Sequence, residues 1–276
     1  DAFSRLIAAN AAVADEDAPP IRRLRRMIDG YVDFGFAHPN AYRLIYLTRP
    51  VEAREGAQDM ARELGGGLFT TLQATVADAV TAGEAGRAFC NVRPPGHHAE
   101  ADRAMGFCLF NNIAVGIHHA LAAHGLKRVA LVDFDVHHGN GSEDIFRNEP
   151  RVLLCSSFRH PFYPYSGSRP HAGFIPAPLP QGADGAAFRA AVDRHFLPAL
   201  EAFRPELVCV SAGFDAHRDD PLGGLNLVEA DYAWITRELC ALADRHAQGR
   251  VVSVLEGGYD LAALGRCAVA HVGAMQ

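Results

Sequence analysis

The chain has 276 residues, of which 49% are hydrophobic, so it is long and apolar enough to fold around a buried core. Its 26 basic and 32 acidic residues give a formal net charge of −6, which disfavours a non-specific binder of nucleic acid. We find no apolar run of about 18 residues and no secretory signal, and therefore expect a cytoplasmic protein without a membrane partner. The six cysteines form no C-x-x-C pair and are expected to be buried thiols.

Residues 1–85 are predicted to be an all-helical segment. The stretch "RRLRRMIDGYVDFGF" carries apolar residues at helical spacing and little strand signal, and "TAGEAG", residues 81–86, suits a boundary with the rest of the chain. No helix-turn-helix pattern lies nearby. We therefore expect a solvated helix face, rather than a DNA contact, from four clustered arginines: Arg22, Arg23, Arg25 and Arg26.

From residue 86 to residue 276, short β-rich runs alternate with longer segments of helical period. The strands are predicted at residues 87–92, 128–135, 151–158, 206–214 and 250–258, and the helices at 110–125, 186–203, 227–247 and from Leu261 onward. Such alternation predicts an α/β domain, an open and mostly parallel sheet with helices on both faces. In this architecture, ligands bind beyond the carboxyl ends of the strands.

Four of the predicted strands end in groups that suit catalysis. If the sheet is parallel, all of these groups lie at one edge. No G-x-G-x-x-G follows a strand, which disfavours a dinucleotide site. Each signal alone is ordinary loop chemistry, and only their joint occurrence favours a metal hydrolase. The groups are His97 and His98, then Asp133, Asp135 and His137, then Asp215, and finally Tyr259.

The stretch "VDFDVHHGNG" accounts for most of this expectation. Asp135 and His137 are two positions apart, so on an extended chain they point to the same side, as does Asp133. With Asp215 from another strand they form a set of three ligands that leaves a position for water, as catalytic zinc requires. A nearby histidine, His97 or His98, could carry the proton, and Tyr259 could hydrogen-bond a developing oxyanion.

Five motifs in order resemble the arginase-like family of histone deacetylases and acetylpolyamine amidohydrolases. They are "RPPGHHAE", "GFCLFNN", "VDFDVHHGNG", "SAGFDAHRDDPLG" and "LEGGYD", and the resemblance covers about residues 87–275. It implies an open α/β sheet of the arginase/deacetylase type. It also implies zinc-dependent hydrolysis of an N-acetyl amide, typically an acetylated lysine side chain or a small acetylated amine, with release of acetate.

The resemblance also implies a role for each matching residue. The zinc ligands would be Asp135, His137 and Asp215, and Tyr259 would bind the acetyl oxygen. His98 would be the main proton shuttle and His97 its partner. Asp133 would orient His97, and Asn140 would lie beside the outer nitrogen of His98, where an uncharged partner leaves the imidazole less basic. A monovalent cation such as K⁺ is implied near the carbonyls around Asp133, Asp135 and His137.

The substrate channel is also assigned from the resemblance. Gly106 precedes Phe107, and Phe107 and Phe158 would be the two aromatic walls around the acyl-lysine methylenes. Leu222 stands where polyamine-selective relatives are expected to carry an acidic residue, which favours a neutral acyl-lysine-like substrate. Because three ligand positions are already filled, the remaining histidines are expected to be structural or surface residues: His118, His119 and His138.

The N-terminal part of the chain departs from this family. The family is expected to carry a first strand and two rim loops that we do not find here. In their place, "IRRLRRMIDGYVDFGFAHPNAYRLIYL" loosely resembles the C-terminal ligand-binding and dimerisation domain of TetR-like regulators. We therefore predict two parts, 1–85 and 86–276, with a homo-oligomer through the first as a further hypothesis.

The sequence thus favours a zinc-dependent deacetylase with an atypical helical N-terminal segment. An acetylpolyamine amidohydrolase is the alternative within the same class. The alternative from another class is a non-catalytic regulator or binding module, which would bind metal without turnover.

Overall fold

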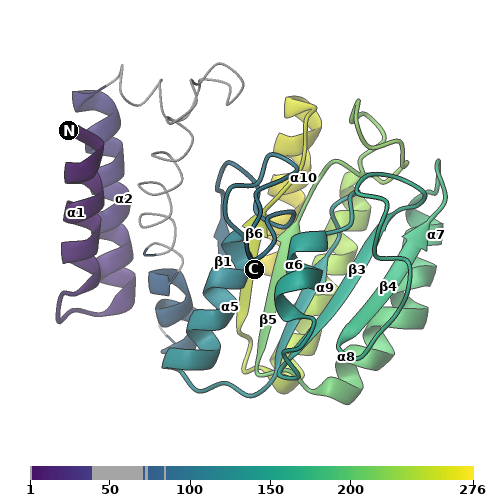
Figure 1. The fold of residues 1–276 in the computed structure, drawn as a ribbon, viewed down its shortest axis with the longest axis horizontal. Helices are drawn as coiled ribbons and strands as arrows, with labels where there is room; N and C mark the ends of the chain where they lie inside the picture. The colour runs from purple at the N-terminus through teal and green to yellow at the C-terminus, as the bar shows by residue number, and fades with distance from the viewer. Residues whose placement is uncertain (1, 39–70, 72–73, 84) are drawn as a thin grey trace.

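The computed structural model describes residues 2–38, 71, 74–83 and 85–276 of the chain. Its first two helices, α1 (Ala2–Ala14) and α2 (Pro20–Ala37), pack against each other and stand beside the α/β part (Figure 1). Pro20 occupies the first turn of α2, where its missing N–H has no helical partner to lose. The predicted helical character is confirmed for these residues. The part of the TetR-like match from residue 39 onward lies outside the described residues.

Six parallel strands form one sheet in the order β1-β6-β5-β2-β3-β4, which confirms the predicted open α/β architecture. One strand, β4, was not predicted. Pro176 and Pro178 remove two backbone donors from it, and prolines are tolerated in a strand mainly at the edge of a sheet, where β4 lies. The bounds are β1 Arg87–Cys90, β2 Val129–Asp133, β3 Val152–Arg159, β4 Phe174–Leu179, β5 Leu207–Ala212 and β6 Val251–Leu255.

Three of the helices that follow strands begin at a capping side chain. Asn111 accepts a hydrogen bond from the backbone N–H of Ala114, Asp184 accepts one from Ala187, and Asp260 accepts one from Ala263. The predicted helix at 186–203 is three consecutive helical pieces. The bounds are α5 Asn112–Ala123, α6 Asn140–Phe146, α7 Gly185–Ala191, a π-helical turn Val192–Phe196, α8 Leu197–Phe203, α9 Glu229–His246 and α10 Leu261–Met275.

The sheet separates two hydrophobic cores. Ala130 and Val132 of β2 belong to the core shared with α7, α8, α9 and α10, whereas Val129 and Leu131 belong to the core shared with α5 and α6. This alternation follows from the two-residue period of a strand. Val76 and Val80, from the helix at residues 74–81, are part of the second core. That helix therefore packs as a layer of the α/β part.

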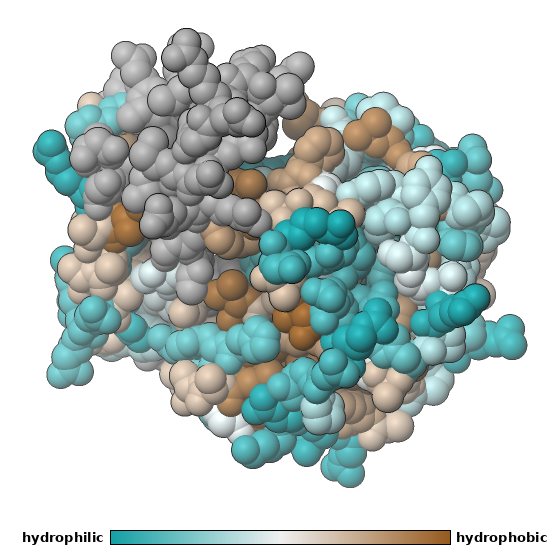
Figure 2. Space-filling view, in the orientation of Figure 1, coloured by the Kyte–Doolittle hydropathy of each residue, from teal (hydrophilic) through white to brown (hydrophobic). Residues whose placement is uncertain are grey.

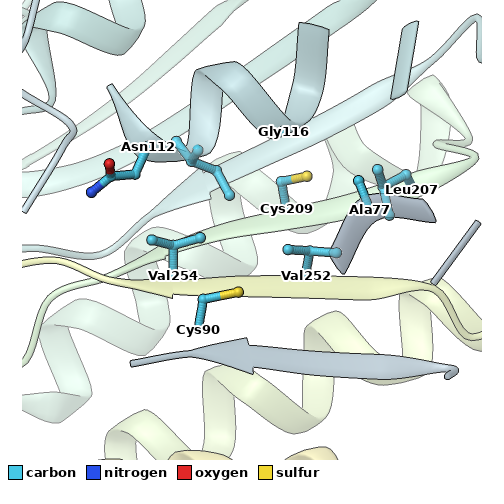
Figure 3. Close-up of a pocket in the computed structure, with 9 residues that line it drawn as sticks. Ala77, Cys90, Asn112, Gly116, Leu207, Cys209, Val252 and Val254 are labelled. Carbon is cyan, nitrogen blue, oxygen red and sulfur yellow. The ribbon is translucent and has the colours of Figure 1, made fainter. Parts of the chain in front are cut away.

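A small apolar pocket lies between this sheet face, α5 and the helix at 74–81 (Figure 3). It is lined by Ala77, Asn112, Cys209, Val252 and Val254, together with Cys90 and three further residues. Burial raises the pKa of the Cys90 thiol to about 12, so this thiol stays protonated. The pocket shares no residue with the groups at the strand ends.

None of the helices in the described ranges combines the length and apolar character needed to cross a membrane. On the face seen in Figure 2, brown apolar patches are scattered among larger teal and white areas.

Candidate active site at the carboxyl ends of four strands

The parallel sheet brings the four predicted groups to one edge. The strands that precede them are immediate neighbours in the order β1-β6-β5-β2. At their centre, His137 Nδ1 lies 3.1 Å from Asp135 Oδ1 and 3.2 Å from Asp215 Oδ2. One ligand atom from each of these three residues lies within 4.8 Å of the others. The three residues predicted from the sequence as ligands therefore lie together in the structure.

Backbone donors hold the two carboxylates of the cluster in place. Val136 N–H donates to Asp215 Oδ1 at 2.9 Å, and Gly257 N–H donates to Asp135 Oδ2 at 2.7 Å. Gly257 must be glycine for this approach, because a Cβ there would lie 2.1 Å from Asp215 Oδ2. The backbone after β6 thus holds Asp135, which follows β2, and the backbone after β2 holds Asp215, which follows β5.

The chemistry of this donor set fits a divalent metal ion. Asp135 and Asp215 are 1% and 0% exposed, and two buried carboxylates so close together need positive charge between them. Burial and the Asp135 carboxylate raise the pKa of Asp215 to about 7. Although burial opposes its charged form, the two carboxylates raise the pKa of His137 to about 10. Oxygen and nitrogen ligands in this number suit catalytic zinc.

His97 is held by three carboxylates. Its Nδ1 lies 2.9 Å from Asp133 Oδ2, and its backbone N–H donates to Glu256 Oε2 at 3.1 Å. Although burial opposes the charged imidazole, Asp133, Asp135 and Glu256 raise the pKa of His97 well above its usual value. Glu256 is fully buried at the end of β6 and also accepts hydrogen bonds from Gly96 N–H and Ser211 Oγ. It was not predicted as a site residue, although it lies in the "LEGGYD" motif.

His98 has an uncharged partner instead. Its Nδ1 lies 2.8 Å from Asn140 Oδ1. Asn140 Nδ2 donates to Glu100 Oε1 at 2.7 Å, which orients the amide so that its oxygen faces His98. His98 Nδ1 therefore carries the hydrogen and Nε2 is left to accept one. Burial and the neighbouring His97 lower the pKa of His98 to about 2, in the direction expected for an uncharged partner.

Tyr259 follows β6 and is held by its backbone. Its N–H donates to Asp220 Oδ2 at 2.7 Å, and Arg93 donates to the carbonyls of Glu256 and Gly258 at 3.1 and 2.8 Å. Burial, then Asp215 and Asp135, raise the pKa of the Tyr259 phenol, so the hydroxyl keeps its proton. Neither Arg93 nor Asp220 was predicted, because both act through backbone atoms and have no periodic signature.

Gly106 and Phe107 lie at the mouth of the cluster. A Cβ at Gly106 would lie 2.2 Å from His98 Cδ2, so glycine lets this loop rest on the imidazole. Phe107 has a φ of 66° and is 69% exposed, with its ring 6.2 Å from that of Tyr259. A bulky residue in the left-handed region is costly, and such strain is common at binding sites.

Phe158 is not a wall of this mouth, contrary to the prediction. It lies inside β3, is 2% exposed and packs 4.8 Å from the ring of His138. The chain must leave the sheet before an aromatic ring can reach the cluster. Tyr163 does so, with its ring 5.1 Å from that of His98 and 6.0 Å from that of His137. The aromatic stretch "HPFYPY" was the signal that could have identified it.

The remaining predicted residues lie outside the central cluster. Leu222 is 48% exposed, and its N–H donates to Asp220 Oδ1 at 2.9 Å, the same carboxylate that holds Tyr259. His138 is buried and lies 2.7 Å from Glu143 Oε2, as expected of a structural histidine. His118 is exposed on α5, whereas His119 is partly buried and is described below.

Together, the open parallel sheet and the histidine–carboxylate cluster beyond its strand ends define an α/β protein whose clustered side chains could hold a metal ion. The model of the histone deacetylase domain matches residues 55–275. The chain belongs to the histone deacetylase family. The match begins 30 residues before the predicted boundary at residue 85, in agreement with the packing of the helix at 74–81.

Similar proteins come from several kingdoms. The chain is 43% identical over 225 residues to a histone deacetylase-like amidohydrolase of Pseudomonas aeruginosa, which covers 79% of this chain and 58% of that protein. It is 37% identical to a probable deacetylase of Archaeoglobus fulgidus, covering 75% of this chain and 58% of the relative. The crystal structure of the HDA15 HD domain matches with a TM-score of 0.69 and 39% identity, over 75% of this chain and 61% of that one. The chain thus spans about three-fifths of the length of these relatives.

Proposed function

We propose that this chain is a zinc-dependent deacetylase that hydrolyses an N-acetyl amide of the acetyl-lysine type to an amine and acetate. One observation carries the proposal: the convergence of Asp135, His137 and Asp215 beside a buried histidine pair and Tyr259. Membership of the histone deacetylase family supports the same reaction, as do relatives named amidohydrolase and deacetylase.

Asp135, His137 and Asp215 would hold the zinc ion. When bound there, zinc supplies a Lewis acid that polarises the amide carbonyl and makes a water molecule more acidic. His98 Nε2 takes a proton from the attacking water and returns it to the leaving amine, because its Nδ1 is committed to Asn140. The Tyr259 hydroxyl donates a hydrogen bond to the carbonyl oxygen as negative charge develops on it.

The surroundings position the reacting groups. His97, fixed by Asp133, lies 4.1 Å from His98 between ring centroids and limits its movement. Phe107 and Tyr163, which contact Tyr259 and His98, supply aromatic surface for the methylenes of a lysine side chain. An exposed leucine at position 222 offers no charge to a polyamine, which favours the neutral acyl-lysine substrate over an acetylated polyamine.

The test is acetate release from an acetyl-lysine peptide by the zinc-loaded chain, with acetylputrescine as the comparison substrate. We expect turnover of the peptide, and a loss of about 100-fold or more in kcat for Tyr259→Phe and His98→Ala at equal zinc content. Tyr165→Phe is the matched control, because Tyr165 is 75% exposed. Zinc binding without turnover by the parent chain would contradict the proposal and favour a binding module.

A further inference from the structure

A second group of histidine and carboxylate ligands lies away from the strand ends. The helix at residues 74–81 lies beside α5 (Figure 1). His119 on α5 and His124 at the C-terminal cap of α5 both contact Asp78 of that helix. The Nε2 atoms of His119 and His124 lie 2.7 and 2.8 Å from the same atom, Asp78 Oδ1. One ligand atom from each residue lies within 4.8 Å of the others.

We propose that Asp78, His119 and His124 form a second metal site, for a divalent transition-metal ion such as Zn²⁺. Two imidazole nitrogens that converge on one carboxylate oxygen provide three of the four ligands of a tetrahedral zinc site. The two rings are 5.4 Å apart between centroids and inclined at 76°, so they approach the carboxylate from different directions, as a tetrahedral ligand set requires. Water can complete the coordination, because the three side chains are 19–28% exposed.

The other oxygen of Asp78 is held separately, which fixes the carboxylate. Arg23 of α2 donates to Asp78 Oδ2 at 3.1 Å and to the carbonyl of Ala14 at 2.5 Å. Oδ1 is therefore presented to the histidines while Oδ2 stays paired, the arrangement that orients metal-ligating carboxylates in proteins. Arg23 is only 15% exposed, so it is not part of the solvated arginine face that the sequence predicts.

The charge of the group selects the kind of ion. The group contains a single carboxylate, that of Asp78. Arg23 offsets its negative charge, which leaves too little anionic character for Ca²⁺ or Mg²⁺. Imidazole ligands favour zinc, cobalt, nickel or copper.

The site joins two parts of the molecule that the sequence assigns to different families. Asp78 is contacted by α2 through Arg23 and by α5 through the two histidines. Metal bound at Oδ1 would therefore stabilise the contact between the helix at 74–81 and the end of α5, without displacing Arg23. The site contains none of the residues of the proposed deacetylase centre, so either proposal can fail without the other.

The test is equilibrium dialysis of the chelator-treated chain against Zn²⁺, with metal counted per chain. The structure predicts two zinc ions for the parent and one for His119→Ala or His124→Ala. In each variant, the affinity for zinc at the Asp78 site should be more than about tenfold weaker than in the parent. His118→Ala is the matched control: the residue is the neighbour of His119 on α5, is exposed, and should leave two ions. Acetate release should be unchanged in all three variants.

A variant that lacks a ligand of the strand-end cluster separates zinc binding at the Asp78 site from zinc binding at the strand ends. In His137→Ala, one zinc should remain, and adding His119→Ala should remove it. When loaded with Co²⁺, His137→Ala should show the visible absorption of a tetrahedral ion, and the double variant with His119→Ala should not. The proposal is overturned if the parent binds a single zinc that His119→Ala leaves in place, or if His137→Ala binds none while still folded by circular dichroism.

Discussion

The two histidine–carboxylate clusters of this protein use similar side chains but are built differently. At the strand ends, the carboxylates of Asp135 and Asp215 are almost fully buried and receive hydrogen bonds from backbone N–H groups. Around Asp78, the carboxylate is partly exposed and its partners are side chains of helices. Backbone donors cannot change rotamer, so the first cluster is preorganised for chemistry, whereas the second is suited only to binding.

The largest effect is expected from removing one charge of the strand-end cluster. Asp215→Asn keeps the shape of the side chain but should lower kcat/KM for an acetyl-lysine peptide by about 1,000-fold or more, because the metal and its charge are lost. Asp219→Asn, at a half-exposed position nearby, is the control. Equal zinc content and turnover in Asp215→Asn and the parent would remove Asp215 from the site.

The next effect tests the backbone that holds the cluster. Gly257→Ala places a Cβ about 2.1 Å from Asp215 Oδ2, so Asp135 and Asp215 must separate, and zinc affinity should fall by more than about tenfold. Gly116→Ala is the matched control, because its Cβ meets nothing within 4 Å and it lies inside α5. That control should raise the free energy of unfolding by about 0.5–1 kcal/mol. Unchanged zinc affinity in Gly257→Ala would show that the close approach is not required.

Another buried histidine, His271 at the core side of the sheet, has hydroxyl groups as its hydrogen-bond partners. It lies between Thr236 Oγ1 and Ser253 Oγ, and burial lowers its pKa to about 4. The unfolded chain therefore binds a proton that the folded chain does not. The stability that the neutral His271 contributes is fully present above the unfolded pKa of about 6.5. It is lost as the pH falls from there toward about 4.

The variant His271→Gln removes this titration. The parent should lose roughly 2 kcal/mol more of its free energy of unfolding between about pH 7 and pH 5 than the variant does. Urea unfolding at both pH values measures the difference. Parallel losses in the two proteins would mean that His271 takes up a proton in the folded state as readily as in the unfolded one.

The smallest effect is expected from a residue that acts on Tyr259 through the backbone. Arg93→Ala removes the hydrogen bonds to the carbonyls of Glu256 and Gly258, and should lower kcat about tenfold with little change in KM. Arg103→Ala, an exposed arginine of the same region, is the control. A purely structural role would lower protein stability and leave kcat of the folded fraction unchanged.

The alternation of strands and helices predicted the sheet because each strand has a buried apolar run and a following helix. The edge strand β4 escaped prediction, since Pro176 and Pro178 are typical of loops and only its place at the sheet edge makes them tolerable. The short helix α6 was missed for another reason. Its first turn begins at Asn140 and Gly141, which read as a turn until tertiary contacts with His97 and His98 fix them.

The strand-end residues could be predicted because parallel strands bring their carboxyl ends to one edge. Tyr163 could not be placed from spacing, since the loop after β3 decides which aromatic ring returns to His98. Glu256, Asp220 and Arg93 bind backbone atoms, which leave no pattern in the sequence. Asp78 and His119 are 41 positions apart, so only the packing of two helices brings them together.

The proposed metal site at the strand ends can be located by anomalous diffraction at the zinc absorption edge from crystals of the zinc-loaded chain. We predict a peak within bonding distance of Asp135, His137 Nδ1 and Asp215, beside His98 and Tyr259. A zinc-loaded crystal with no anomalous peak among these three residues would contradict this prediction.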